Sequence, residues 1–257
     1  MKKTIALTMA LMLITALAGC TMQQPVTMLQ PEQTAEQPQE QTQEQSMGQD
    51  PTQESTPEAA DFPVIPSTEM SYSREEVIKL LGDPDKRIDF EESNHLFYNK
   101  YNRVFGVGEG YVWDVTYEYE TVNGISFRMP AEEVIQKLGE PNSKGVAEYV
   151  EALGSWYQTW TYNDLGLDVR MQSEEENMSD ATIMFYMALN RNSNIKLNSG
   201  IGIGSTKDEV IKAYCVGMFP EDGIYDDGIR VGNIDSNIYF YLEGNNVVGI
   251  NFEVQIN

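Results

Sequence analysis

The chain has 257 residues, and its 17 basic and 40 acidic side chains give a formal net charge of −23. This balance argues against nucleic-acid binding, which depends on lysines and arginines that replace phosphate counterions. It also opposes close contact with an anionic lipid surface. Partners of the folded part are therefore expected to be neutral, cationic or bridged by a divalent cation.

The N-terminus has the layout of a secretory signal. Lys2 and Lys3 precede an apolar run over Thr4–Leu17, which is shorter than the ~20 residues that a membrane span needs. The run ends in Leu17-Ala18-Gly19-Cys20, which resembles the lipobox of bacterial lipoproteins. The resemblance implies a signal peptide over residues 1–19 and an acylated Cys20 that anchors the chain in the bilayer. The alternative is an ordinary signal peptide that happens to end near a cysteine.

Composition changes directly after Cys20. From Thr21 to Ser73 the chain has no lysine or arginine, but nine acidic residues and eleven glutamines. Such a segment cannot bury enough apolar surface to offset the entropy lost on ordering. We therefore predict a disordered Gln/Glu/Pro-rich stalk over residues 20–66 and a folded region after it.

A recurring segment predicts three short helices. Ser73–Pro84 reads Ser-Arg-Glu-Glu-Val-Ile-Lys-Leu-Leu-Gly-Asp-Pro, and Pro130–Pro141 and Thr206–Cys215 repeat much of it. Serine or threonine followed three residues later by glutamate is a capping box, and glycine before proline ends a helix. The third copy lacks the glycine, so its helix is expected to continue to about Gly217. Equivalent positions, expected to be buried, hold Val77, Val134 and Val210.

Alternating polar and apolar residues predict antiparallel strands around these helices. The expected strands, in chain order, cover residues 111–120, 156–162, 165–171, 183–189, 237–242 and 247–254. The first alternates strictly and should expose Asp114, Thr116, Glu118 and Glu120. In the fourth, Ile183, Phe185, Met187 and Leu189 should share one face. Helices followed by antiparallel strands, repeated along the chain, favour an α+β fold.

Together these segments resemble the SmpA/OmlA (BamE-like) lipoproteins, and equally the tandem-repeat β-lactamase inhibitor protein that shares their fold. The middle segment carries the resemblance best, with Glu133-Val134, Gly139-Glu140-Pro141 and Trp160-Thr161-Tyr162. It implies tandem units of short helices packed on antiparallel β-sheets. The units would be a divergent first over 67–128, a second over 129–197 and a third over 198–257. Members of this fold that are understood act by binding other proteins, as subunits of assembly complexes or as inhibitors.

Residues that could carry catalysis do not form a known pattern. His95, the one histidine of the sequence, is expected to lie partly exposed at the start of a strand, with no nucleophile elbow to accompany it. The sequence also lacks the His and Cys spacing of zinc sites, so no metal or cofactor is expected. The acidic runs Glu174–Glu176 and Asp226-Asp227 lack the ligand spacing of a calcium loop and are expected to be solvated.

A glycine-rich segment over residues 101–110 is the candidate binding element. Val104, Phe105 and Val107 lie in it, and apolar residues on a mobile loop can anchor a partner. The alternative is that they tuck beneath the loop as a small apolar cluster. Three tryptophans are expected to be core residues, namely Trp113, Trp156 and Trp160.

These observations predict a surface-tethered bacterial lipoprotein that acts as a non-catalytic protein-binding or envelope-assembly module. Its expected partners are the lipid bilayer, through acylated Cys20, and another envelope protein, but not nucleic acid. Because Thr21 rather than aspartate follows Cys20, the outer membrane is expected if the cell has two membranes. The alternatives are an inhibitor of an envelope hydrolase and a carboxylate-based cell-wall hydrolase.

Overall fold

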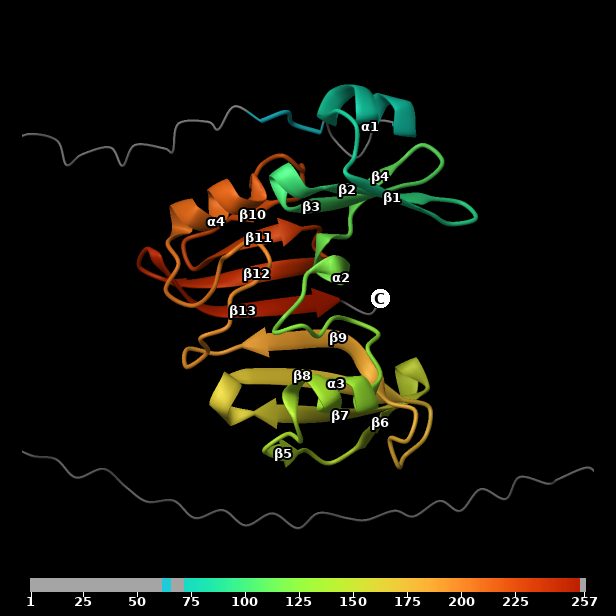
Figure 1. Cartoon of the computed structure of the whole chain (residues 1–257), viewed down its shortest axis with the longest axis vertical. Helices are drawn as coiled ribbons and strands as arrows, with labels where there is room; N and C mark the ends of the chain where they lie inside the picture. Colours follow the sequence, from blue (N-terminus) through green and yellow to red (C-terminus); the bar gives the residue numbers. More distant parts are fainter. Residues whose placement is uncertain (1–61, 66–71, 255–257) are drawn as a thin grey trace, which may run out of the picture. The chain divides into compact units, whose positions relative to one another are not determined.

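A computed structural model describes residues 62–65 and 72–254 (Figure 1). These residues belong to one compact unit, Gln53–Asn257. The predicted signal peptide, Cys20 and the stalk up to residue 61 lie outside the described residues. The described part consists mainly of antiparallel strands with a few short helices, so the predicted α+β class is confirmed.

The first strands form a four-stranded antiparallel sheet in the order β1-β2-β3-β4. Its strands are β1 (Lys86–Asp89), β2 (Asn94–Tyr98), β3 (Arg103–Val107) and β4 (Val112–Asp114). Helix α1 (Arg74–Leu81) packs on one face of this sheet, where Leu81 meets Leu96 and Phe105 in a buried cluster. Phe219, from the segment after the third predicted helix, completes this cluster.

The remaining strands form one nine-stranded antiparallel sheet (Figure 1). In sheet order they are β10 (Gly223–Ile224), β11 (Gly228–Gly232), β12 (Ser236–Glu243), β13 (Asn246–Val254), β9 (Thr182–Leu189), β8 (Leu167–Ser173), β7 (Ser155–Tyr162) and β5 (Ser143–Lys144), with β6 (Glu148–Val150) also paired to β7. The strands predicted over 156–162 and 165–171 pair as the β7–β8 hairpin, and those over 237–242 and 247–254 pair as the β12–β13 hairpin. Strands assigned to the second and third units therefore share a sheet, joined where β13 pairs with β9.

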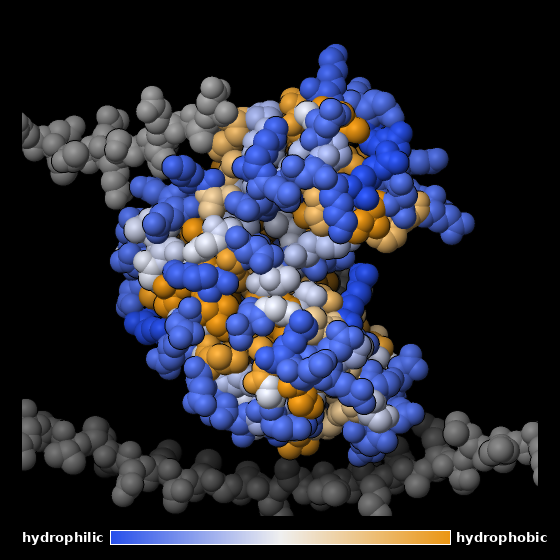
Figure 2. Space-filling model, in the orientation of Figure 1, coloured by the Kyte–Doolittle hydropathy of each residue, from blue (hydrophilic) through white to orange (hydrophobic). Residues whose placement is uncertain are grey.

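Helices α3 (Ala131–Leu138) and α4 (Lys207–Tyr214) lie on one face of the nine-stranded sheet (Figure 1). Polar side chains cover most of the molecule on this side (Figure 2). Both predicted capping boxes are present, at α1 and α4, and Val77, Val134 and Val210 are buried as expected. In β9, Ile183, Met187 and Leu189 are also buried as expected, while the side chain of Phe185 lies outside the described part of the chain.

Helix α4 ends earlier than its sequence predicts. The expected continuation to Gly217 is wrong, because Cys215 adopts the left-handed conformation with φ of 48° and ends the helix. The side chain of Asp222 accepts hydrogen bonds from the backbone N–H groups of Gly217 and Phe219. The N–H groups of Gly217 and Phe219 thus bind a side chain instead of the carbonyls that would continue the helix, and the chain leaves the helix axis here.

The predicted strand over residues 111–120 is the main error. Strand β4 ends at Asp114, and Thr116–Tyr119 form the short helix α2. Three of the four residues expected on the solvent face are instead buried, with exposures of 1% for Asp114, 3% for Thr116 and 4% for Glu120, whereas Glu118 is partly exposed. Their polar groups find partners inside the protein, since Glu120 accepts hydrogen bonds from the Asn198 N–H and the Tyr214 hydroxyl. In this segment the alternating polar residues therefore belong to a buried hydrogen-bond network and do not mark a solvent-facing side of a strand.

The interpretation of residues 101–110 as a mobile binding loop is also wrong. Arg103–Val107 form β3, which pairs with β2 on one side and β4 on the other. Val104, Phe105 and Val107 are all buried, which excludes them as exposed partner anchors. β-branched and aromatic residues suit such a central strand. Trp160 is a core residue as predicted, whereas Trp113 and Trp156 are partly exposed.

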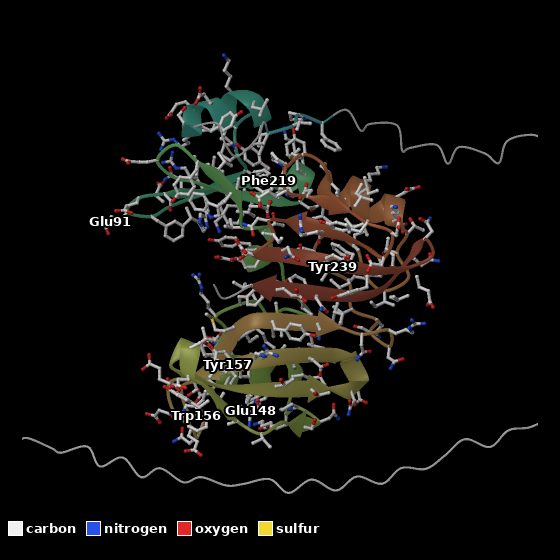
Figure 3. The ribbon with its side chains drawn as sticks, turned by 180° about the vertical axis from the view of Figure 1, so that it is seen from behind. Glu91, Glu148, Trp156, Tyr157, Phe219 and Tyr239 are labelled. Carbon is white, nitrogen blue, oxygen red and sulfur yellow. The ribbon has the colours of Figure 1, made fainter. Side chains whose placement is uncertain are left out.

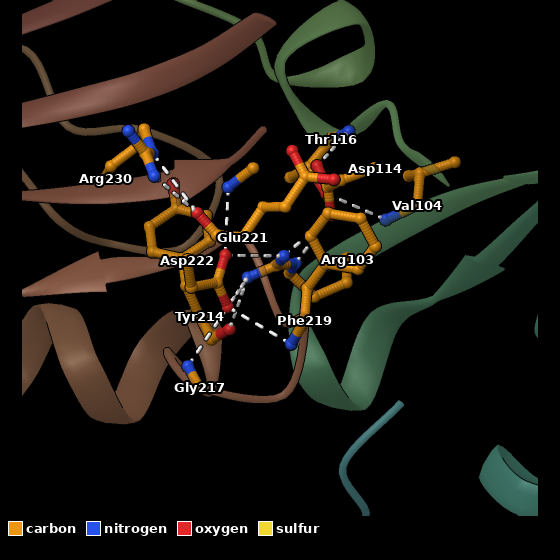
Figure 4. Close-up of polar contacts among 11 residues, drawn as sticks. Arg103, Val104, Asp114, Thr116, Tyr214, Gly217, Phe219, Glu221, Asp222 and Arg230 are labelled. Atoms are coloured by element: carbon orange, nitrogen blue, oxygen red, sulfur yellow. Dashed lines mark hydrogen bonds and ion pairs between the residues drawn. The ribbon is translucent and has the colours of Figure 1, made fainter. Parts of the chain in front are cut away.

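Arg103 forms a buried ionic network between the two sheets (Figure 4). Its guanidinium contacts the Asp114 carboxylate at 2.7 Å and the Asp222 carboxylate at 3.0 Å, and it donates a hydrogen bond to the Tyr214 carbonyl. Asp222 lies between α4 and β10, so the network joins the four-stranded sheet to the edge of the nine-stranded sheet. Although burial disfavours the charged guanidinium, these two carboxylates raise the pKa of Arg103 above its ordinary value.

Replacing Arg103 by leucine should strongly destabilise the protein. The substitution leaves two buried carboxylates without a counter-charge, which typically costs about 3–5 kcal/mol. Urea unfolding of Arg103→Leu would measure this loss. Arg87→Leu is the matched control, because Arg87 forms a solvent-exposed ion pair with Asp89, and exposed pairs contribute about 0–1 kcal/mol. Equal losses in the two variants would contradict a central role for the buried network.

Candidate binding surface

The face of the nine-stranded sheet opposite α3 and α4 carries no α-helix of the described segments, and the 3-10 helix η2 (Glu151–Leu153) lies at its edge beside Tyr157 (Figure 3). Along β12, Ile238 and Phe240 point into the core, so Tyr239 and Tyr241 between and beyond them point outward. The strand registers place further outward residues beside them. We define the open face as Tyr157, Thr159, Thr161, Asp168, Arg170, Gln172, Tyr186, Arg230, Asn237, Tyr239, Tyr241, Asn251 and Glu253, with Tyr225 at its edge.

Tyrosine rings are held in place along one end of the open face. The rings of Tyr225 and Tyr239 stack with centroids 6.2 Å apart, and those of Tyr239 and Tyr241 lie 4.7 Å apart. Gly228 provides the space beneath, because a Cβ at this position would approach the Tyr239 ring to 2.4 Å. The absence of a side chain at Gly228 therefore lets the Tyr239 ring lie against the backbone of the sheet.

Polar contacts hold the neighbouring side chains of the open face. Arg230 lies over the Tyr225 ring at 5.6 Å and donates to the Glu221 carbonyl through two nitrogens. The Asn251 side-chain amide donates to the Tyr241 hydroxyl at 3.2 Å. The conformations of these planar side chains are thus largely set before any partner arrives.

Burial and the nearby Asp227 carboxylate raise the pKa of Tyr239 to about 12. The Tyr239 hydroxyl donates to the Asp227 carboxylate at 3.2 Å. Ionisation would place a second negative charge beside Asp227, so this carboxylate opposes loss of the phenol proton.

Pockets lie at both ends of the open face. One, of about 370 Å³, is called the Tyr239 pocket and is lined by Tyr225, Asp227, Arg230, Ile234, Asn237, Tyr239 and Glu253. A second, of about 450 Å³, lies beside Tyr157 and Arg170, next to residues 145–153. A larger pocket of about 740 Å³ is found elsewhere, between the β1–β2 turn, the β3–β4 turn and the start of α1.

His95 is buried in an aromatic cluster. Its exposure is 8%, its Nδ1 lies 2.8 Å from the Tyr119 hydroxyl, and its ring packs against those of Phe90 and Trp113. The expectation of a partly exposed histidine is wrong, because α2 places Tyr119 over this strand. Burial lowers the pKa of His95, which favours the neutral ring. These contacts describe a packed side chain rather than a base that activates a nucleophile.

The acidic runs singled out in the sequence are exposed, as expected. Glu174–Glu176 and Asp226-Asp227 all lie on the surface. Within residues 62–65 and 72–254, no group of three or more histidine, cysteine, aspartate or glutamate side chains is arranged to hold a metal ion. No helix in the same ranges is long and apolar enough to cross a membrane.

No open-face residue stands out as a site from the sequence alone. One signal points to them: the tyrosines of β12 occupy the alternate positions that face solvent in a half-buried strand. A contiguous patch of exposed apolar surface marks an interaction site, but such a patch is visible only once the strands are paired. The pairing of distant strands was also needed to bring Tyr186, Arg230 and Tyr241 onto one face.

Comparison with known proteins does not assign the chain to a family. No family model and no curated protein matches the chain. Among solved structures, an extracellular protein containing a SCP domain from Bacillus anthracis str. Ames matches with 16% identity and a TM-score of 0.35. The match covers 50% of this chain and 44% of that one. A likeness this low carries no argument about fold or function.

Asp227→Asn should lower the pKa of Tyr239 from about 12. The substitution removes the negative charge that opposes ionisation, while burial still holds the pKa above the ordinary value of about 10. Carbon-13 NMR of the tyrosine ring carbons, with Tyr239→Phe for assignment, would follow the titration. Asp226→Asn, an exposed neighbour, should leave the pKa unchanged. An unchanged pKa in Asp227→Asn would show that Asp227 does not set the ionisation of Tyr239.

Proposed function

We propose that this chain is a surface-tethered bacterial lipoprotein whose folded part is a non-catalytic protein-binding module, with the open face as its binding surface. The observation that carries this proposal is a sheet face that is free of α-helices and rich in tyrosine, with arginine and asparagine among them. Tyrosine and arginine are enriched in protein interfaces and dominate their binding energy. Tyrosine offers a large contact area for few rotatable bonds.

The rigidity of the open face supports the same function. Its side chains stand on paired strands, and several are already stacked or hydrogen-bonded, as with Tyr239, Arg230 and Asn251. A partner that binds such a surface orders few new rotamers, so less of the contact energy is lost to entropy. The chain's strong negative charge favours a partner with a basic surface.

The tandem arrangement inferred from the sequence is part of this proposal. Helices α1, α3 and α4 each bury a valine at the same position and begin with an acidic first turn. Gly82 and Gly139 end α1 and α3 with φ of 87° and 83°. These shared features support an origin of the three helices in repeated units of the BamE-like type.

The lipid anchor is proposed from the sequence alone, because Cys20 lies outside the described residues. Cys20→Ser should abolish incorporation of labelled palmitate and release the protein from membranes, since the acylated cysteine supplies the anchor. Cys215→Ser is the matched control and should keep the label, because Cys215 is a buried free thiol of the folded part. Membrane-bound, labelled Cys20→Ser protein would refute the lipobox interpretation.

Tyr241→Ala should weaken capture of an envelope protein by the full chain. A central interface tyrosine typically contributes about 2 kcal/mol, or roughly thirtyfold in affinity. The measurement is a pull-down from solubilised membranes, followed by titration of the captured protein. Tyr111→Ala is the control, because Tyr111 is 55% exposed against 39% for Tyr241 but lies by the four-stranded sheet.

Two outcomes would contradict the proposed function. Equal binding by the Tyr241→Ala and Tyr111→Ala variants would remove the open face as the binding surface. Turnover of a cell-wall glycan or peptide, with no stable protein partner, would favour the hydrolase alternative. Adding the full chain to purified envelope hydrolases tests the inhibitor alternative directly.

A further inference from the structure

The Tyr239 pocket contains a buried acceptor that no described residue satisfies. Asn237 is 4% exposed, and its Oδ1 receives no hydrogen bond from the described part of the chain. Its Nδ2 donates to the Ile234 carbonyl at 3.4 Å, so the opposite amide orientation would bring two oxygens together. The free atom is therefore the oxygen. A buried polar atom left in this state is costly. Because Asn237 lines the pocket, a ligand whose donor displaces the groups that cover this oxygen would remove the cost.

The other polar groups of the pocket define the ligand further. Asp227 and Glu253 present carboxylate oxygens, which accept hydrogen bonds. Arg230 is the cation that lines the pocket, but its Nε and one terminal nitrogen are bound to the Glu221 carbonyl. The Tyr239 hydroxyl donates a hydrogen bond to Asp227. The pocket thus carries two carboxylates against one guanidinium, so it has more negative than positive charge.

Aromatic rings provide the remaining contact surface. Tyr225 and Tyr239 line the pocket, and their rings are nearly parallel, with an interplanar angle of 24°. The face of a tyrosine ring attracts a cation placed within about 6 Å. A guanidinium group combines a planar cation with five N–H donors, so it can stack on a ring and donate to several acceptors at once.

We propose that the Tyr239 pocket binds an arginine side chain of the partner protein. Its guanidinium would donate to Asn237 Oδ1 and to the carboxylate of Glu253, which pairs with Asn237 across β12 and β13, with a tyrosine ring against its plane. A volume of about 370 Å³ accommodates such a side chain. This inference rests on the proposed function, because it places one anchor of the partner at the end of the open face.

The test is an NMR titration of the isotope-labelled full chain with N-acetyl-arginine amide. The side-chain amide of Asn237 and the ring of Tyr239 should show saturable shifts. The probe control is N-acetyl-citrulline amide, which has the same shape without the charge and should bind at least about tenfold more weakly. Equal shifts with both compounds would overturn the inference.

Variants locate the site. Asn237→Ala and Glu253→Gln should each weaken binding of N-acetyl-arginine amide by about fivefold or more, since each removes an acceptor or a charge. Glu243→Gln is the matched control, because Glu243 is exposed at the far end of β12, outside the pocket, and should bind like the unmodified chain. If Asn237→Ala fails to fold, the partly exposed Glu253 decides the question. Unchanged binding in Glu253→Gln would overturn the inference.

The outcomes also separate this inference from the proposed function. Protein capture that depends on Tyr241, without binding of N-acetyl-arginine amide, would overturn the arginine pocket and leave the open face as the binding surface. Binding of N-acetyl-arginine amide in the pocket, without capture of any protein through Tyr241, would support the cation site and overturn the protein-binding function.

Discussion

Arg103 of β3 lies buried between the carboxylates of Asp114 and Asp222, and much of the structure depends on this contact. A buried guanidinium is tolerated where its charge is balanced and its donors are used, and here a third acceptor is the Tyr214 carbonyl. Asp222 also binds the N–H of Gly232, which secures the end of β11. Its neighbour Glu221 offers a carbonyl to Arg230, the arginine over Tyr225. The buried ion pair is therefore connected, through Asp222 and its neighbour Glu221, to the side chains at the edge of the open face.

The open face, which we propose as the binding surface, is built on paired strands and needs no mobile loop. Outward-pointing tyrosines of β12 lie beside strands in which glycine leaves room for their rings, as Gly228 does beneath Tyr239. The cost of exposing aromatic rings is reduced by stacking between Tyr225, Tyr239 and Tyr241. Asn237 Oδ1, at the edge of this surface, is a buried acceptor that receives no hydrogen bond from the described residues. In an acidic protein, this combination suits a basic, hydrogen-bond-donating surface.

Local chemistry made some elements of the fold predictable. The capping boxes of α1 and α4 need only residues three positions apart, and the hairpin β12–β13 needs only a turn between two short strands. The prediction of a strand over residues 111–120 was wrong because the polar groups of this segment bind residues far away in the sequence. Alternating polar residues usually mark a solvent face, but Asp114 is neutralised by Arg103 and Glu120 is bound by Tyr214, a residue 94 positions away. Patterns within a short window carry no information about such partners.

The sequence by itself determined the α+β class, the starts of the capped helices and the burial of Val77, Val134 and Val210. These features follow from hydrogen bonds and apolar periodicity over a few residues. Only the tertiary structure decided where α4 ends, why residues 103–107 are buried, and which tyrosines share a face. Those outcomes depend on the pairing of β9 with β13 and on the Arg103–Asp222 contact, which spans 119 residues. Long-range pairing is set by the packing of the whole chain, because each contact is favourable only when its distant partner is already in place.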